Sequence, residues 1–575
     1  MRYDLVIANG DVVDGSGLPR RRADVGVRDG RVVALGHLDG SEAGEVIDAA
    51  GMVVAPGIVD IHTHYDLQLT WDPWATASCY HGVTTVVAGN CGFSAAPTPP
   101  GQREFLTALF AQVEGMDPTA LSATRWDFET FPEYLEARAG RLGVNLAAYL
   151  GHSNVRRLVM GADGSERAAT AEEVEAMRRV VREAMEAGAA GLSSSRSPTH
   201  HDGDLRPVPS RLAEIDELVA LVEETGRGGG GTVTFLPESA VGGLDEDDED
   251  LLIELSLAGR IPIIIQGLGG RSKVDAPTAT WERAQAFLDR ATARGAAVYS
   301  LLITRPFDRP FNLSDGTTLY EGVPAWDRML KLPLAERIRA LQDPAVRDQL
   351  RHAVEHPNRD PEQGSTLPPP HWGSLVVARV SKPELERFLS RSVADIAAGE
   401  GKAPADALLD LALADDLRTE LRWSTETAAW AEAVAEAQVD PHLLIGTSDG
   451  GAHLSRDDGS EFSTYFLRRW VLDERIWTLE EGIRQITEIP ANLMGFHDRG
   501  MVRPSYRADL VVLDPEALGP WKKELVHDLP GGVGRFQAYP KGVHATVVNG
   551  VPIVRDGEIT GALPGQVVRP GARPG

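Results

Sequence analysis

The chain of 575 residues has only two cysteines, Cys79 and Cys91. A single pair cannot form the disulfide framework of a small secreted domain, so the fold must depend on a buried apolar core. The sequence contains no run of 18 apolar residues, which is about the length that a membrane-spanning helix needs. The first residues carry Asp4 within their apolar run, which does not fit a signal peptide. We therefore expect a cytoplasmic protein that does not span a membrane.

Positive charge is also scarce. Lys and Arg total 57 against 84 Asp and Glu, a formal net charge of −27. Nucleic acids and anionic membrane surfaces recruit positive charge, so neither is expected as a partner. A small anionic substrate stays open, because one arginine in a cleft can dominate the local field. The acidic run 245–250 is expected at an exposed helix start or loop, and a homo-oligomer is left open.

Both ends of the chain have the pattern of short strands and tight turns. Asn9-Gly10, Asp29-Gly30 and Asn549-Gly550 are typical hairpin turns. Apolar strands flank them over residues 3–55 and again over 508–514, 543–549 and 551–555. We expect residues 1–56 and 500–565 to form one small β-sandwich domain together.

The middle of the chain, 57–499, alternates apolar runs with helical stretches, which indicates βα units and a parallel sheet. Eight is the number of strands that closes a (β/α)8 barrel of the TIM type, and an open doubly wound sheet is the alternative. The eight expected strands are Ile58–His64, Val83–Ala88, Val144–Leu150, Gly191–Ser195, Thr232–Leu236, Ile261–Gln266, Ala297–Ile303 and Leu443–Thr447.

The gap between the last two strands is too long for a plain βα unit. Residues from about 305 to 440 contain helices such as Pro333–Leu341 and Pro344–Glu355, where Pro344 suits a first helical turn. We interpret this stretch as an inserted lid or subdomain. A surface decoration without a role is the alternative.

Two histidines end the first strand of the barrel. Side chains alternate along a strand, so His62 and His64 should point the same way. Two imidazoles at the carboxyl end of a barrel strand supply half of a metal site. The alternative, two unrelated surface histidines, fits poorly with the buried strand before them and with Tyr65-Asp66 after them.

Two further candidates follow other strands. Cys91, between Gly89 and Gly92, follows the second strand, and a thiolate there could ligate the same ion. Asp449 follows the eighth strand, where a carboxylate can bind the ion and accept a proton from water. The alternatives are a small buried residue for Cys91 and a turn-forming residue for Asp449. On the same loop, His453 could touch the substrate.

These motifs resemble the amidohydrolase superfamily, specifically its N-acyl-D-amino-acid deacylase (D-aminoacylase) family. The likeness runs nearly end to end and is weakest over 230–440. The matching pieces are Gly57–Asp66, Gly89–Gly92, Gly151–Arg156, Gly188–Ser193, Gly446–Gly450, Ala508–Asp514, Val548–Val554 and Thr560–Gly565. The resemblance implies a barrel with a two-part β-domain, a zinc site and hydrolysis of an amide.

The resemblance also implies roles for particular residues. His62, His64 and Asp449 match the more exposed metal site of the family, with Asp449 as general base, and Cys91 matches a thiolate ligand. The family has further histidines after strands five and six, where this chain has Phe235 and Gln266. We therefore expect one zinc ion rather than two.

Other polar residues at the expected mouth of the barrel could replace the missing histidines or hold a substrate. Glu238, His200 and His201 are candidates for replacement, with a solvated loop as the alternative for the histidines. A substrate carboxylate could be held by an arginine. The expected substrate-binding residues are Arg196, His201, Arg305 and His453, and Arg456 competes for the same role. His152 and Arg156 match family motifs, and structural hydrogen bonds are expected of them.

The leading hypothesis is deacylation of an N-acyl (D-)amino acid by metal-activated water, with a small molecule as the only expected partner. The first alternative is hydrolysis of a cyclic amide, an imide or a lactone. The second is a non-catalytic member of the family that binds a ligand at a degenerate metal site. Metal analysis and assays on both substrate classes separate the three.

Overall fold

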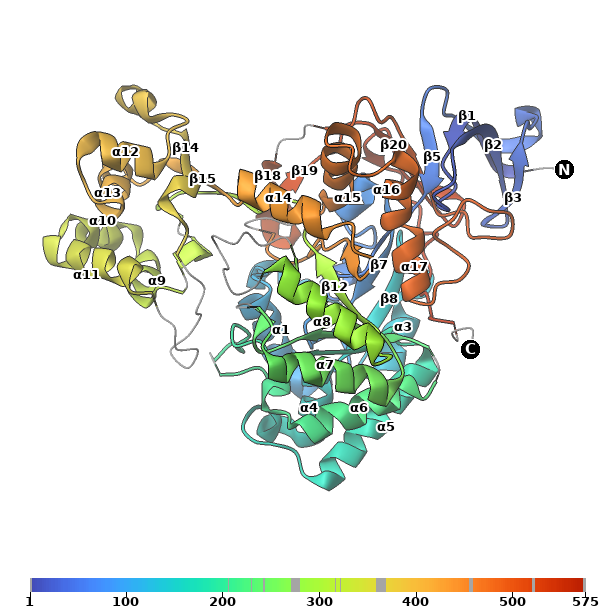
Figure 1. Ribbon diagram of the computed structural model, residues 1–575, viewed down its shortest axis with the longest axis horizontal. Coiled ribbons are helices and arrows are strands. Elements are labelled where there is room, and N and C mark those ends of the chain that lie inside the picture. The colour runs from blue at the N-terminus through green and yellow to red at the C-terminus, as the bar shows by residue number, and fades with distance from the viewer. Residues whose placement is uncertain are drawn as a thin grey trace. The chain divides into compact units, whose positions relative to one another are not determined.

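The computed structural model describes residues 3–204, 206–228, 230–240, 243–269, 280–315, 317–320, 322–357, 369–454, 459–519 and 523–571. The chain divides into two compact units. The larger unit comprises residues 1–197, 202–305 and 429–575, and the smaller comprises 198–201 and 306–428. Figure 1 draws both, with most of the smaller unit in yellow-green to gold. No helix among the described residues is both long and apolar enough to cross a bilayer.

Eight parallel strands form the centre of the larger unit, in an unbroken order of neighbours from the first to the last. The expected (β/α)8 barrel is confirmed, and each expected strand is present, four of them two to four residues shorter. Their inward and outward faces are both buried, as continuous apolar runs require. The strands are β6 (Ile58–Asp60), β7 (Val83–Ala88), β8 (Asn145–Gly151), β9 (Gly191–Ser195), β10 (Thr232–Leu236), β11 (Ile263–Gln266), β12 (Val298–Leu302) and β16 (Leu443–Ile445).

The first and last strands meet just beyond their carboxyl ends. Thr63 and Gly450 form an isolated parallel bridge, and the amide of His64 donates to the carbonyl of Gly450 at 2.7 Å. Gly450 has no room for a side chain, since a Cβ there would lie 2.8 Å from the Tyr65 ring. This bridge closes the barrel at the end where the candidate site residues lie.

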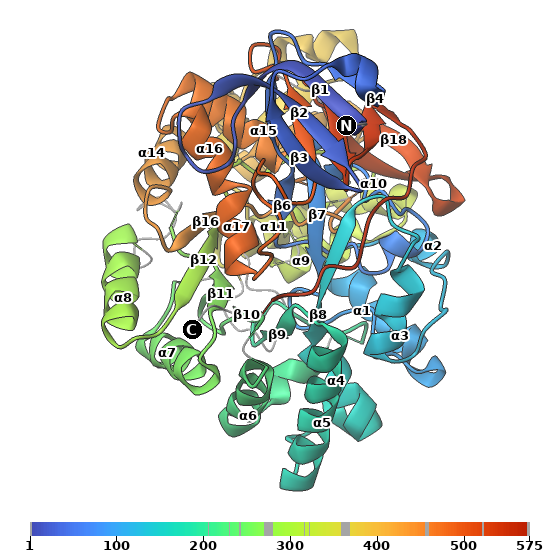
Figure 2. The same ribbon diagram turned by 90° about the vertical axis from the view of Figure 1, so that its right-hand side faces the viewer.

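Helices pack around the outside of the strands (Figure 2). α5 begins with a capping box between Thr170 and Glu173. The acidic run 245–250 supplies the cap and first turn of α7, where negative charge is favourable beside the amino end of the helix. The helices of this unit are α1 (Arg103–Val113), α2 (Pro118–Leu121), α3 (Phe131–Arg138), α4 (His152–Met160), α5 (Ala171–Ala187), α6 (Ile215–Gly226), α7 (Glu246–Gly259), α8 (Trp281–Ala293), α14 (Ala428–Ala437), α15 (Phe462–Phe466), α16 (Leu479–Gln485) and α17 (Glu488–Leu493).

Both chain ends contribute to a single nine-stranded sheet, which confirms the expected composite β-domain. The two halves join where β5 pairs antiparallel with β17, and β1 pairs with β2, β4 and β5. Its apolar face buries residues of both halves, such as Ile7, Val54 and Val512. The strands are β1 (Tyr3–Val12), β2 (Arg21–Arg28), β3 (Arg31–Gly36), β4 (Ala43–Asp48), β5 (Val53–Pro56), β17 (Leu510–Leu513), β20 (Val543–Val548), β21 (Val551–Arg555) and β22 (Glu558–Ile559).

Two C-terminal segments also contact the barrel itself. The hairpin β18–β19 (Lys523–Leu529 and Val533–Ala538) reaches the loop after β16, where the amide of Phe536 donates to the carbonyl of Leu454 at 2.9 Å. The tail 565–568 pairs with the start of β8: Leu142 bridges Gly565, and Leu146 bridges Val567. The tail therefore pairs with β8 ahead of Tyr149, where β9 begins to pair with it.

The smaller unit has a core of its own. Its three-stranded antiparallel sheet has the order β13, β15, β14. Trp326 is buried at its centre, stacked on Tyr320 at 4.3 Å between ring centroids, and its indole N–H donates to the carbonyl of Leu350. The elements are β13 (Asp308–Phe311), α9 (Pro324–Leu330), α10 (Leu334–Gln342), α11 (Pro344–Glu355), β14 (Leu375–Arg379), α12 (Val393–Glu400), α13 (Pro404–Ala414) and β15 (Glu420–Ser424).

Candidate metal centre

The carboxyl ends of three barrel strands bring four candidate ligands together. His62 and His64 follow β6, Cys91 follows β7 and Asp449 follows β16. Both imidazoles are buried, and the Asp449 carboxylate is 24% exposed, so a small molecule can reach it. Both imidazoles thus lie beside the partly exposed Asp449 carboxylate, and His62 also lies beside the Cys91 thiol.

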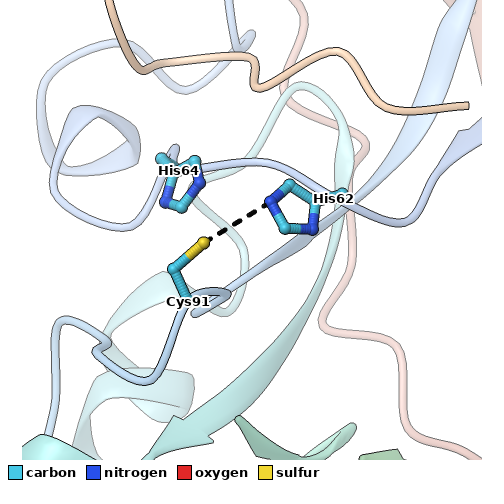
Figure 3. Close-up of side chains that lie close together, drawn as sticks. All are labelled: His62, His64 and Cys91. Carbon is cyan, nitrogen blue, oxygen red and sulfur yellow. Dashed lines mark hydrogen bonds between the residues drawn. The ribbon is translucent and has the colours of Figure 1, made fainter. Parts of the chain in front are cut away.

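The two imidazoles lie close to Cys91 and, separately, close to Asp449. The side chains of His62, His64 and Cys91 lie close together (Figure 3), and their ligand atoms are all within 4.8 Å of one another. Cys91 Sγ is 3.8 Å from His62 Nε2. Asp449 Oδ1 is 3.3 Å from His62 Nε2 and 3.7 Å from His64 Nε2. Zinc bonds of about 2.0–2.3 Å place tetrahedral ligand atoms roughly 3.3–3.7 Å apart, and these three separations, from 3.3 to 3.8 Å, are close to that spacing.

Tight backbone turns aim two of these side chains inward. Cys91 and Asp449 both have left-handed backbones, with φ of 57° and 55°. Gly89 makes the turn before Cys91 possible: it has φ of 81°, and a Cβ there would lie 2.4 Å from the Tyr149 carbonyl oxygen. Such strain in non-glycine residues persists where the surrounding structure enforces it, and it is frequent at functional sites.

The ionisation of Asp449 and Cys91 reflects their buried surroundings. Burial alone would raise the pKa of Asp449, but hydrogen bonding and charge from His62 and His64 outweigh it and hold that pKa well below its usual range. Burial raises the pKa of the Cys91 thiol, and the charges of Glu114 and Asp449 raise it further. Without a cation the cluster therefore pairs an ionised carboxylate with a protonated thiol.

Two buried aspartates support the loops that carry the ligands. Asp60 accepts the amide of His62 at 3.3 Å. Asp66 accepts the amides of Gly89 and Ala95 at 3.0 and 3.2 Å, which ties the loop after β6 to the loop after β7. Burial raises the pKa of both carboxyls to about 7. Sequence inspection did not single out Asp60.

Glu114 is a second residue that the motifs did not reveal. It ends α1 and is buried, with a side chain 4% exposed. Its Oε1 lies 3.4 Å from His64 Nδ1, and its Oε2 lies 3.8 Å from His453 Nε2. The available signal was an acidic residue at the carboxyl end of an apolar helix, where the helix dipole disfavours negative charge.

The positions after strands five and six do not offer imidazoles. Phe235 is 2% exposed and packs in the main core of the larger unit. The Gln266 side-chain amide lies 2.9 and 3.2 Å from the two ring nitrogens of His62. A carboxamide thus occupies the space beside His62 where a second ion would need a strong ligand.

The predicted substrate-binding residues lie in different surroundings. Arg196 is 25% exposed and pairs with Glu238 at 3.2 Å. Arg305 is 3% exposed and faces Glu461 at 4.0 Å. His453 is on the loop of Asp449, beside Glu114. His200 and His201 are in the segment Pro198–His201, which is part of the smaller unit and not of the unit that holds the cluster.

Arg456 lies outside the described residues. Two other sequence candidates, His152 and Arg156, belong to a separate buried network. His152 is fully buried between Ser194 Oγ and Glu217 Oε1, at 2.9 Å from each. Arg156 donates to the other oxygen of Glu217 and to two backbone carbonyls. This network joins α4, β9 and α6, as expected of structural hydrogen bonds.

Comparison with known proteins places this geometry in context. Residues 45–554 match the model of the amidohydrolase family. The chain is 28% identical to D-aminoacylase of Alcaligenes xylosoxydans xylosoxydans (98% of this chain, 97% of the relative). It is 30% identical to N-acyl-D-aspartate deacylase of the same organism (99% and 95%). It is 25% identical to the solved N-acyl-D-glutamate deacylase of Bordetella bronchiseptica, complexed with zinc and a phosphonate inhibitor, with a TM-score of 0.64 (99% and 100%).

Proposed function

Because the chain belongs to the amidohydrolase family, we propose that it hydrolyses the amide bond of an N-acyl amino acid at a zinc centre held by His62, His64, Cys91 and Asp449. One observation carries the proposal: Asp449 Oδ1 lies 3.3 and 3.7 Å from the two imidazoles, and Cys91 lies on the same cluster. Two imidazoles, a thiol and a carboxylate are ligands that zinc prefers.

The chemistry divides between the ion and the chain. When bound, zinc acts as a Lewis acid that polarises the acyl carbonyl and acidifies water. Asp449 is the residue that moves the proton: its carboxylate is ionised and exposed enough to meet substrate. An oxygen of Asp449 accepts the proton of the attacking water and then delivers it to the nitrogen of the leaving amine.

We propose a single catalytic ion. Phe235 carries no donor atom, and the side chain of Gln266 offers only a neutral amide oxygen, which is not among the usual ligands of zinc. A second zinc would therefore have few strong ligands in the space beside His62. One zinc with three or four protein ligands is sufficient for hydrolysis.

The substrate class follows the relatives, whose names specify D-aminoacylase and deacylases of N-acyl-D-aspartate and N-acyl-D-glutamate. We propose an N-acyl-D-amino acid whose free carboxylate is bound by Arg196. This guanidinium is more exposed than that of Arg305, and its partner Glu238 is itself 61% exposed and can move aside. Planar bidentate binding of a carboxylate is the chemistry that arginine provides best.

The test uses Asp449→Ala with the exposed Asp473→Ala as the matched control (43% exposed side chain). In zinc-loaded protein, Asp449→Ala should lower kcat/KM by at least about 10²–10⁴-fold, the usual contribution of a general base, with its circular dichroism unchanged. The control should keep full activity. Wild-type kcat/KM in Asp449→Ala would contradict the role assigned to Asp449.

A substrate panel tests the class of reaction. The panel contains N-acetyl-D- and N-acetyl-L-amino acids, a cyclic imide and a lactone, each assayed with zinc. Turnover of N-acetyl-D-amino acids supports the proposal, and turnover of the cyclic compounds alone would replace it. A protein that binds no zinc and turns over nothing would be a ligand-binding member of the family.

A further inference from the structure

The buried carboxylate of Glu114 is unfavourable for the stability of the fold. Its carboxylate is 4% exposed, and it caps the carboxyl end of α1, where the helix dipole is already negative. Burying a charge costs free energy unless partners compensate it. Two imidazoles lie beside Glu114: that of His64, which follows the first barrel strand, and that of His453, which follows the last.

The first imidazole is that of His64. His64 turns Nε2 toward Asp449, at 3.7 Å, and Nδ1 toward Glu114, at 3.4 Å. A neutral imidazole that uses Nε2 as a ligand carries its proton on Nδ1. That proton therefore faces the Glu114 carboxylate, which can fix both the tautomer and the ring orientation.

The second imidazole is that of His453, four residues after Asp449 on the same loop. The amide of His453 donates to the Glu114 carbonyl at 2.7 Å, and His453 Nε2 lies 3.8 Å from Glu114 Oε2. His453 holds a left-handed backbone conformation with φ of 52°. Glu114 thus contacts the loop that presents Asp449 through both its backbone and its side chain.

We propose that Glu114 is a positioning residue of the metal centre, which orients His64 for the ion and anchors the Asp449 loop through His453. The inference rests on the proposed zinc centre and adds to it a residue outside the ligand set. Outer-sphere carboxylates of this kind typically change metal affinity or activity by about 10–100-fold when they are removed.

The experiment measures zinc affinity by competition with a chromophoric chelator, for wild type, Glu114→Leu and Glu114→Gln. The matched control is Glu224→Gln, because Glu224 is equally buried in the same unit but pairs with Arg178, Arg182 and Arg227. Glu114→Leu should bind zinc about 10–100-fold more weakly. Glu114→Gln keeps a neutral hydrogen-bond acceptor, so its zinc affinity should fall less, by about fivefold. The control should bind zinc as wild type does.

A second readout separates positioning from mere support of the fold. Cobalt(II) in place of zinc reports ligand geometry through its visible spectrum, which Glu114→Gln should change and Glu224→Gln should not. If Glu114→Leu does not fold, Glu114→Gln decides alone. Wild-type zinc affinity and an unchanged cobalt spectrum in Glu114→Gln would overturn this inference, whereas a wild-type protein that binds no zinc would overturn the proposed function instead.

Discussion

The backbone of Thr63 pairs with that of Gly450, which joins the loop of the two histidines to the loop of Asp449. The adjacent hydrogen bond from the His64 amide to the Gly450 carbonyl, at 2.7 Å, strengthens this junction. The bridge that closes the barrel therefore also sets the distance between the imidazoles and the carboxylate. Stability of the barrel and geometry of the proposed metal centre depend on the same few backbone atoms.

Replacing Cys91 by alanine should weaken zinc binding by more than the roughly 10–100-fold that loss of an outer-sphere partner costs. Cys91 Sγ lies 3.8 Å from His62 Nε2, so the thiolate would be a direct ligand. The cobalt(II) protein should lose its thiolate-to-metal charge-transfer band. Cys79→Ala is the control, because Cys79 is buried away from the cluster in the core. A Cys91→Ala protein that retained the band would contradict the ligand assignment.

Replacing Gly89 by alanine should destabilise the protein by about 2–4 kcal/mol. The alanine would have to adopt the left-handed backbone of Gly89, and its Cβ would lie 2.4 Å from the carbonyl oxygen of Tyr149. Displacement of the turn should also lower zinc affinity, since Cys91 is two residues away. Gly101→Ala is the control, because a Cβ at Gly101 would extend into open space. Urea unfolding should show it within about 0.5 kcal/mol of wild type.

Acid should destabilise the fold through His81. This imidazole is buried between Thr464 Oγ1 and the Ala538 carbonyl, and burial lowers its pKa from 6.5 to about 4. Between these two values the unfolded chain binds a proton that the folded protein does not, so stability falls as pH falls from about 6.5 to 4. The loss amounts to about 3 kcal/mol.

The measurement for His81 is urea unfolding of metal-free protein across this pH window. His81→Gln should be less stable at pH 7, but the gap to wild type should narrow by about 3 kcal/mol at pH 4. The exposed His37→Gln variant should follow wild type throughout. If the free energy of unfolding changed with pH by the same amount in wild type and His81→Gln, the assignment of this pH dependence to His81 would be wrong.

Arg535 should be among the most stabilising charged residues of the β18–β19 hairpin. Its buried guanidinium pairs with Asp528 at 2.7 Å and donates to the Thr76 carbonyl and hydroxyl. Arg535→Met should lower the free energy of unfolding by about 2–4 kcal/mol, because it removes several hydrogen bonds made by a buried charge. Urea unfolding measures both variants, and Arg555→Met, which breaks an exposed pair with Glu45, should cost at most about 1 kcal/mol.

The barrel strands were predicted from their mostly apolar runs, because strands of a parallel sheet that are buried on both faces are rich in apolar residues. Strand ends were less well defined: Ile58–His64 was expected as one strand, and β6 ends at Asp60. His62 and His64 nevertheless lie on one side, with ring centroids 5.3 Å apart, since the bridge at Thr63 continues the extended backbone. The amidohydrolase resemblance is confirmed by the family match.

Glu114 and Gln266 show what the sequence could not reveal. Glu114 lies in no motif, and its position beside His64 depends on how α1 packs on the barrel, which local spacing does not encode. Gln266 was recognised as a departure, yet its contact with both nitrogens of His62 appears only once β6 and β11 face each other across the barrel. Residues that act through distant contacts need the tertiary structure to be found.

The tail 565–568 is synthesised last, yet it pairs with the start of β8, so this part of the barrel can complete its pairing only at the end of synthesis. During translation β1–β5 emerge well before β17 and the tail. The nascent protein therefore carries an unpaired edge of β5 and an unpaired edge at the start of β8 until these C-terminal segments leave the ribosome. Its exposure to aggregation and its need for chaperones should be greatest just before they do.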